Sequence, residues 1–137
     1  MKKNKKKRID IYKTIYDIDI VVANQYTTLK DLQKKYKYAD DGSELDDFIT
    51  QGYGTTAMVR DKKTNASCCL VRFNKTVERT DIDKLLDTID TCVHEAMHCL
   101  IDIYASVDAQ IQYTNPEPVC YEIANISKNI LKTILNR

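Results

Sequence analysis

The chain has 137 residues, a formal net charge of +1 and 43% hydrophobic residues. This length suits a single domain that buries one core without covalent cross-links. No apolar stretch approaches the roughly 20 residues of a membrane span, and the basic start lacks the apolar segment of a secretion signal. The sequence therefore predicts a soluble, cytoplasmic protein and argues against membrane attachment.

The charge is distributed unevenly along the chain. Residues 2–8 carry six positive charges, which leaves a net charge of −5 on the rest. Short basic runs can bind nucleic acid, a membrane surface or an acidic partner, but most are solvated tails, and no aromatic residue interrupts this one. We expect residues 1–8 to form a flexible basic arm and residues 9–137 to form one acidic domain, which argues against nucleic acid as a partner except through the arm.

The first predicted element is a strand over residues 9–22, which are rich in β-branched and aromatic side chains with period-two alternation. The alternation slips by one near Asp17, so a break or bulge is expected there. A short helix is then expected from Thr27 or Thr28 to Tyr36.

Residues 39–54 are predicted to be the least regular part of the domain, since they contain all three glycines and five acidic residues. The acidic run lacks the ligand spacing of a calcium loop, so we interpret it as a solvated surface rather than a second metal site. Leu45, Phe48 and Ile49 are expected to form a helical turn that docks on the core.

Residues 55–60 and 67–73 are predicted to form a β-hairpin, because the intervening Asp-Lys-Lys-Thr-Asn has good turn chemistry. This hairpin leads directly into the next helix. If the sheet packs on that helix, one strand of the hairpin can form the wall of a cleft.

A long amphipathic helix is predicted to begin at Thr80, which with Asp83 resembles a capping box. It contains the only two histidines of the chain, four residues apart. Both histidines fall outside the apolar stripe, so the helix has a core face and a site face. The stripe that is expected to be buried consists of Ile82, Leu85, Leu86, Ile89, Val93, Ala96, Met97, Leu100, Ile101 and Tyr104.

The last predicted element is a helix capped by Asn115, with Pro116 in its first turn. Residues 106–114 return the chain, so this helix should pack against the preceding one. Its apolar positions continue nearly to the end of the chain and are Val119, Cys120, Ile123, Ala124, Ile126, Ile130, Leu131, Ile134 and Leu135.

The segment His94-Glu95-Ala96-Met97-His98 has the H-E-x-x-H pattern of zinc hydrolases. Helical residues four apart lie on one face, so both imidazoles can bind one tetrahedral Zn²⁺. Glu95 lies about 100° further round the helix, where its carboxylate can reach a water on the metal and act as a general base. The alternative is a chance pair of histidines on a polar helix face, and the helical context favours the metal site.

A zinc site of this kind needs a third protein ligand. The pattern H-E-x-x-H-x-x-G-x-x-H is excluded, because Ile101 and Tyr104 stand at its glycine and its third histidine. The ligand is therefore expected to be a carboxylate or, less favoured, a cysteine. Glu117 and Glu122 are the leading candidates, and spacing alone does not separate them.

The cysteines are odd in number and form no C-x-x-C pair, so we expect reduced, mostly buried, small apolar side chains. Cys99 directly follows a histidine, but adjacent helical residues diverge, which disfavours a cysteine nucleophile. The five cysteines are Cys68, Cys69, Cys92, Cys99 and Cys120.

The segment from Val93 to His98, together with residues 117–121, Ile123 and Ala124, resembles small zincin-like metallopeptidases encoded by bacteriophages. Their pattern is an H-E-x-x-H helix followed by a second helix that opens with Glu-x-x-Ala-Tyr-x-Val-Gly. The resemblance covers mainly residues 80–135. It implies a minimal zincin-like α+β fold, with a small, mostly antiparallel sheet packed on the H-E-x-x-H helix and the C-terminal helix across it.

The resemblance also implies that Glu117, which opens the second motif, is the third zinc ligand. The chain departs from the family pattern at Cys120 and Ala124, which are mild changes at small positions. Glu122 is an additional acidic neighbour.

The residues and the resemblance together predict a zinc-dependent hydrolase, namely a metallopeptidase that acts on a peptide or protein. Zn²⁺ would be held by the two histidines and Glu117, and Glu95 would take a proton from water and pass it to the leaving amine. Tyr121 or Tyr113 is a candidate for stabilising the oxyanion. The alternative is a non-catalytic zincin-like phage protein, a virion component or host-factor binder, whose metal is structural or absent.

Overall fold

The structure, a computed structural model, describes residues 5–137, so the first four residues of the predicted arm lie outside it. The chain folds as an α+β domain with one five-stranded sheet. No helix in residues 5–137 is both long enough and apolar enough to cross a membrane. The elements are β1 (Ile9–Tyr12), β2 (Asp19–Ala23), α1 (Leu29–Lys35), β3 (Tyr36–Tyr38), the 3-10 helix η1 (Asp47–Thr50), β4 (Gly54–Asp61), β5 (Ser67–Phe73), α2 (Ile82–Ser106) and α3 (Glu117–Ile134).

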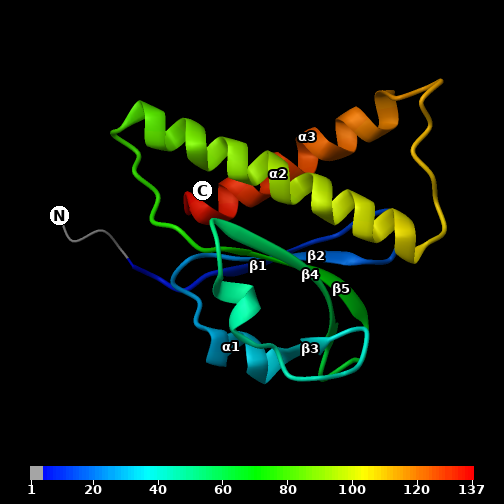
Figure 1. Ribbon diagram of the computed structural model, residues 1–137, viewed down its shortest axis with the longest axis horizontal. Helices are drawn as coiled ribbons and strands as arrows, with labels where there is room; N and C mark the ends of the chain where they lie inside the picture. Colours follow the sequence, from blue (N-terminus) through cyan, green and yellow to red (C-terminus); the bar gives the residue numbers. More distant parts are fainter. Residues whose placement is uncertain (1–4) are drawn as a thin grey trace.

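The strands form one mixed sheet in the order β1-β2-β5-β4-β3 (Figure 1). Three neighbouring pairs are antiparallel, whereas β2 and β5 are parallel, with Ile20 opposite Cys69. A parallel pair needs a long crossover, which here contains α1, β3, η1 and β4. The prediction of a small, mostly antiparallel sheet is therefore confirmed.

The first strand prediction is only partly right. Residues 9–22 form two antiparallel strands, β1 and β2, rather than one. The chain turns at Asp17, which adopts a left-handed φ of 57° that aspartate tolerates in tight turns. The Thr14 hydroxyl closes the turn by donating to the carbonyl of Ile18 at 2.7 Å. The slip in alternation thus marks a reversal of the chain.

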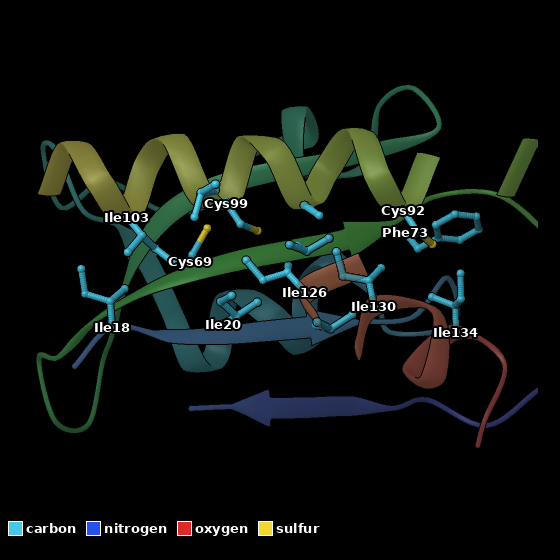
Figure 2. Packing of buried hydrophobic residues seen from close by; sticks show 14 of the residues in the cluster. Ile18, Ile20, Cys69, Phe73, Cys92, Cys99, Ile103, Ile126, Ile130 and Ile134 are labelled. Atoms are coloured by element: carbon cyan, nitrogen blue, oxygen red, sulfur yellow. The ribbon is translucent and has the colours of Figure 1, made fainter. Parts of the chain in front are cut away.

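The sheet separates two hydrophobic cores. α2 and α3 cover one face, and α1 and η1 lie on the other (Figure 1). Alternate residues of β2 serve the two cores, with Ile20 and Val22 facing α2 and α3, and Val21 facing α1. The larger core is filled mainly by isoleucine, valine and cysteine side chains between the sheet and the long helices (Figure 2).

The predicted elements on the smaller core are confirmed. Thr28 is the N-cap of α1 and forms a capping box with Asp31. Leu45 and Ile49 are buried, as the predicted helical turn requires, whereas Phe48 is 52% exposed.

The predicted hairpin is also confirmed, as β4 and β5. Asp61 fixes its turn, because its carboxylate accepts from the N–H groups of Lys63 and Thr64. Asn65 completes the turn with a φ of 61°.

The N-cap of α2 is Asp81, not the predicted Thr80. The Asp81 carboxylate accepts from the N–H groups of Asp83 and Lys84, which would otherwise lack partners in the first turn.

The buried face of α2 differs from the predicted stripe. Ile82, Leu86, Ile89, Val93 and Ile101 are between 39% and 66% exposed. The physical reason is that α2 carries apolar residues on more than one face, and the face with several small side chains can approach the sheet most closely. The buried residues of α2 are Thr88, Cys92, Glu95, Ala96, Cys99, Leu100, Ile103 and Tyr104.

Helix α3 crosses α2, and the two helices diverge toward the loop that joins them (Figure 1). Its N-cap is Pro116, without a side-chain cap hydrogen bond, so the prediction that Asn115 caps it is wrong. Near the other end of α3, the Thr133 hydroxyl donates to Asp10 Oδ2 at 2.7 Å and shares a 2.7 Å hydrogen bond with the Tyr12 hydroxyl. These contacts tie α3 to β1.

The described part of the basic arm contacts the domain. The carbonyl of Lys6 accepts from Asn24 Nδ2 at 2.8 Å, and Lys7 pairs with Asp31 at 2.9 Å. The Lys7 ammonium, together with the Thr28 donors, holds the pKa of the Asp31 carboxyl well below its usual range. The contacts of the domain therefore extend into the arm, before the predicted boundary at residue 9.

The orientation of α2 can be tested with two isoleucines of the same helix. Ile103 is 1% exposed and Ile101 is 47% exposed. We expect Ile103→Ala to lower the free energy of unfolding by about 2–5 kcal/mol, because it leaves a cavity. The matched change Ile101→Ala should cost about 1 kcal/mol or less. Urea unfolding measures both, and equal losses would contradict the observed orientation.

Candidate metal centre

His94 and His98 lie one turn apart on the exposed side of α2, as their spacing predicts. Their Nε2 atoms are 3.1 Å apart, and their ring centroids are 4.8 Å apart. The two imidazoles therefore converge on one point beside the helix, each with the same ring nitrogen.

This geometry suits two ligands of one zinc ion. Zinc–nitrogen bonds of about 2.0–2.1 Å at a tetrahedral angle place two ligand nitrogens about 3.3 Å apart. The observed 3.1 Å between the Nε2 atoms of His94 and His98 is close to that separation. Neutral imidazole nitrogen is also a preferred zinc ligand, so the histidine pair fits the metal.

Glu95 points toward the sheet and is only 5% exposed. The Thr56 hydroxyl of β4 donates to Glu95 Oε2 at 2.5 Å. Side chains alternate along β4, so the neighbouring Thr55 points to the other face, where it donates to the carbonyl of Ile49. The carboxylate next to the first histidine is therefore held by the strand beneath it.

Gly54 allows β4 to come this close to α2. A Cβ at this position would lie 3.2 Å from Glu95 Cγ and 3.3 Å from Thr91 Cγ2, closer than ordinary carbon contacts. Its backbone φ is not left-handed, so the requirement for glycine comes from space alone.

A cleft of about 220 Å³ lies beside His94, between the start of β4 and α2. It confirms the expectation that one strand of the hairpin forms the wall of a cleft. Its lining residues are Tyr53, Gly54, Asp90, Thr91, His94 and Glu95.

The structure does not gather a third ligand. No three His, Cys, Asp or Glu side chains in residues 5–137 form a group that could hold a metal ion. Glu117 is exposed at the first residue of α3, where this helix diverges from α2 (Figure 1). Glu122 instead accepts hydrogen bonds from Tyr16 at 2.6 Å and from Tyr104 at 2.5 Å.

The two tyrosines suggested for the oxyanion are exposed, Tyr121 by 72% and Tyr113 by 88%, and neither lines the cleft. The tyrosine at the cleft is Tyr53. Tyr53 and Thr56 are not singled out by the sequence pattern, although Thr56 belongs to the strand expected at the cleft wall and Tyr53 directly precedes β4. Alternation along that strand could have selected Thr56.

The buried thiols have unreactive environments. Burial raises the pKa of Cys68 to about 11 and of Cys92 to about 12, and the neighbouring Glu95 adds to the rise at Cys92. Four of the five cysteines are buried, and only Cys120 is exposed. The expectation that most are small apolar residues is therefore confirmed.

Asp102 lies one turn beyond His98. Burial raises the pKa of its carboxyl, an effect that the nearby His98 opposes and that Asp40 reinforces. None of the ion pairs within residues 5–137 joins Asp102 to His98.

The contact between Thr56 and Glu95 gives a stability prediction. Thr56→Val keeps the side-chain shape but removes the hydroxyl donor of a buried carboxylate. We expect the free energy of unfolding to fall by about 1–3 kcal/mol at neutral pH, as measured by urea unfolding. Thr56→Ser keeps the hydroxyl and should retain most of the stability. A fully stable Thr56→Val protein would show that the contact contributes nothing.

Comparisons with protein-family models, with curated proteins and with solved structures found no match. The resemblance to phage zincin-like metallopeptidases stays a prediction from the sequence.

Proposed function

We propose that the protein is a zinc-dependent peptidase with a minimal zincin-like fold. His94 and His98 would hold the metal, and Glu95 would be the general base. The observation that carries the proposal is the convergence of the two Nε2 atoms at 3.1 Å, beside a buried carboxylate that a strand holds in place. A purely structural zinc site has no need of such a carboxylate.

The chemistry divides between the metal and Glu95. When bound, a zinc ion would act as a Lewis acid and would lower the pKa of its coordinated water toward about 7. Glu95 lines the cleft, where it can accept a proton from water and return it to the leaving amine. Thr56 fixes one carboxylate oxygen, and a fixed base loses less freedom on reaching the transition state.

The edge of β4 supports a peptide as the substrate. β3 pairs with β4 only from Val59 to Asp61, so the stretch from Gly54 to Ala57 has no partner strand on that side in residues 5–137. An extended peptide can add to such an edge through backbone hydrogen bonds. This edge adjoins the cleft that contains Glu95.

Glu117 is our proposed third ligand. Its carboxylate is exposed, whereas Glu122 is engaged by two tyrosine hydroxyls. Coordination by Glu117 would require the first turn of α3 to approach His98 from its place in the structure. The first turn of α3 lacks a side-chain cap, which lowers the cost of moving it.

A second candidate function is non-catalytic binding of another protein, as a virion component or host-factor binder. The observation that favours it is the row of exposed apolar residues on α2, namely Ile82, Leu86, Ile89 and Val93. Rows of this kind are typical of protein-interaction surfaces. The experiments below separate the two functions.

The metal site predicts distinct zinc contents. His94→Ala and His98→Ala should each abolish stoichiometric zinc binding, because the chain has no further histidine that could replace the lost ligand. Glu117→Ala should weaken zinc binding severely, and Glu122→Ala is the matched control on the same helix. Elemental analysis and competition with a chelator measure both. Loss of zinc in Glu122→Ala with retention in Glu117→Ala would reverse the ligand assignment.

The general base predicts a separate effect on rate. Glu95→Gln keeps the side-chain shape but cannot accept a proton, so hydrolysis should fall by about 10²–10⁴-fold with zinc content unchanged. A substrate is first found by incubating the wild type with a cell lysate and mapping new peptide termini. Equal cleavage by zinc-loaded Glu95→Gln would exclude this mechanism. Absence of zinc-dependent cleavage by the wild type would favour the non-catalytic function.

A further inference from the structure

Glu122 lies in a polar cluster that the proposed peptidase site does not use. It accepts hydrogen bonds from the hydroxyls of Tyr16 and Tyr104, whose rings meet edge to face with centroids 5.6 Å apart. Burial, together with the hydrogen bonds to Glu122, raises the pKa of both phenols. Both tyrosines are therefore protonated donors at neutral pH, and Glu122 is their acceptor.

This cluster borders a cavity of about 230 Å³ between the β1–β2 hairpin, α2 and α3. Its floor is apolar and includes Ile103 and Ile126, which are 1% and 7% exposed. Its polar rim comes largely from one face of α3, where Glu122, Asn125 and Asn129 follow each other at helical spacing. The cavity thus combines an apolar floor with a row of hydrogen-bonding groups.

The cavity is separate from the cleft beside the histidines. Ile103 is nine residues, or about two and a half turns, beyond His94, which places the two on opposite sides of α2. The volume of the cavity, about 230 Å³, also suits a small organic molecule, because a cavity of about 150 Å³ is enough to bind benzene.

The charge of Glu122 indicates the kind of ligand. None of the ion pairs within residues 5–137 includes Glu122, and Lys13 at the cavity rim is paired with Asp19 at 2.8 Å. Tyrosine hydroxyls satisfy the carboxylate without neutralising it. A carboxylate has about four acceptor positions, and the tyrosines use two. A partly buried anion with free acceptor positions favours a cation that donates N–H groups.

We infer that this cavity binds a small organic ammonium ion, with its N–H groups on Glu122 and its apolar body on the isoleucine floor. Tyr16 lines the cavity, and an aromatic ring there can add a cation–π contact. The amides of Asn125 and Asn129 can bind a further polar group of the ligand. A free amine and the side chain of a lysine share this chemistry.

The direct test is an NMR titration of the full chain with benzylamine and with benzyl alcohol, its uncharged counterpart. Benzylamine should cause saturable shifts in the backbone amides of Asn125, Asn129 and Ile103. Benzyl alcohol should bind at least about tenfold more weakly, since it lacks the charge that Glu122 recognises. Equal affinity for the two compounds would show that only the apolar floor binds, and would overturn the inference.

Two variants test the assignment to this cavity. Glu122→Gln removes the charge and should weaken benzylamine binding by about tenfold or more. The matched control is Glu44→Gln, at an exposed carboxylate that pairs with Lys62 and does not line the cavity. If Glu122→Gln does not fold, Asn129→Leu keeps the carboxylate but narrows the cavity, and should abolish binding. Unchanged affinity in either variant would contradict the site.

A blocked peptide with a single lysine distinguishes the two sources of the ammonium group. Tighter binding of this peptide than of benzylamine, with shifts in the same amides, would identify the side chain of a protein partner. Tighter binding of benzylamine would identify a free amine. Absence of saturable binding by both probes would overturn the inference.

Discussion

The close approach of α2 to the sheet is the constraint on which the candidate metal site depends. Ala96 and Cys99 lie on the face of α2 that is turned toward the sheet and are fully buried, and Cys99 is directed toward Cys69 of β5 (Figure 2). Gly54 removes the remaining obstacle on β4, where any Cβ would press against Glu95. Because the small side chains face inward, the helix can lie low enough for a strand to hold a helical carboxylate. With this face of α2 against the sheet, the imidazoles of His94 and His98 lie on the exposed side of the helix.

Two carboxylates, one on α2 and one on α3, are held by the same kind of interaction, a hydrogen bond from a side-chain hydroxyl. Glu95 is bonded by a threonine hydroxyl, and Glu122 by two tyrosine hydroxyls. A lysine or arginine partner would cancel the negative charge, whereas a hydroxyl satisfies the oxygen and leaves the charge in place. Each carboxylate therefore stays able to attract a proton or a cation. This shared feature separates these two groups from Asp31, whose carboxylate is paired with a lysine.

Features that depend on neighbouring residues could be predicted from the sequence. The turn between β4 and β5 follows from local turn chemistry, and the convergence of the histidines follows from four-residue spacing on a helix. The α+β class and the packing of the two long helices also follow from such local patterns. Each of these features is indicated by turn residues, residue spacing or hydrophobic periodicity within a short stretch of sequence.

Features that depend on distant contacts could not be predicted. The partner of Glu95 is Thr56, 39 residues earlier, and Glu122 is bonded to Tyr16, 106 residues earlier. The buried face of α2 differs from the predicted stripe for a related reason, since apolar residues occupy more than one face of the helix and the fit to the sheet selects which face is buried. The hydrophobic pattern contains no measure of that fit. The place of Glu122 likewise depends on a hairpin turn that the strand pattern does not reveal.

The contact between Thr133 and Asp10 has a consequence for how the chain folds. It joins residues 123 positions apart, and the parallel pairing of β2 with β5 joins Ile20 to Cys69. Such contacts form only after large loops close, so folding is expected to be slow for a chain of this length. Until α3 docks, apolar side chains of β1 and β2 lack part of their cover and can meet other chains. The chain is therefore expected to be most prone to aggregation during folding, before α3 docks, rather than in the native state.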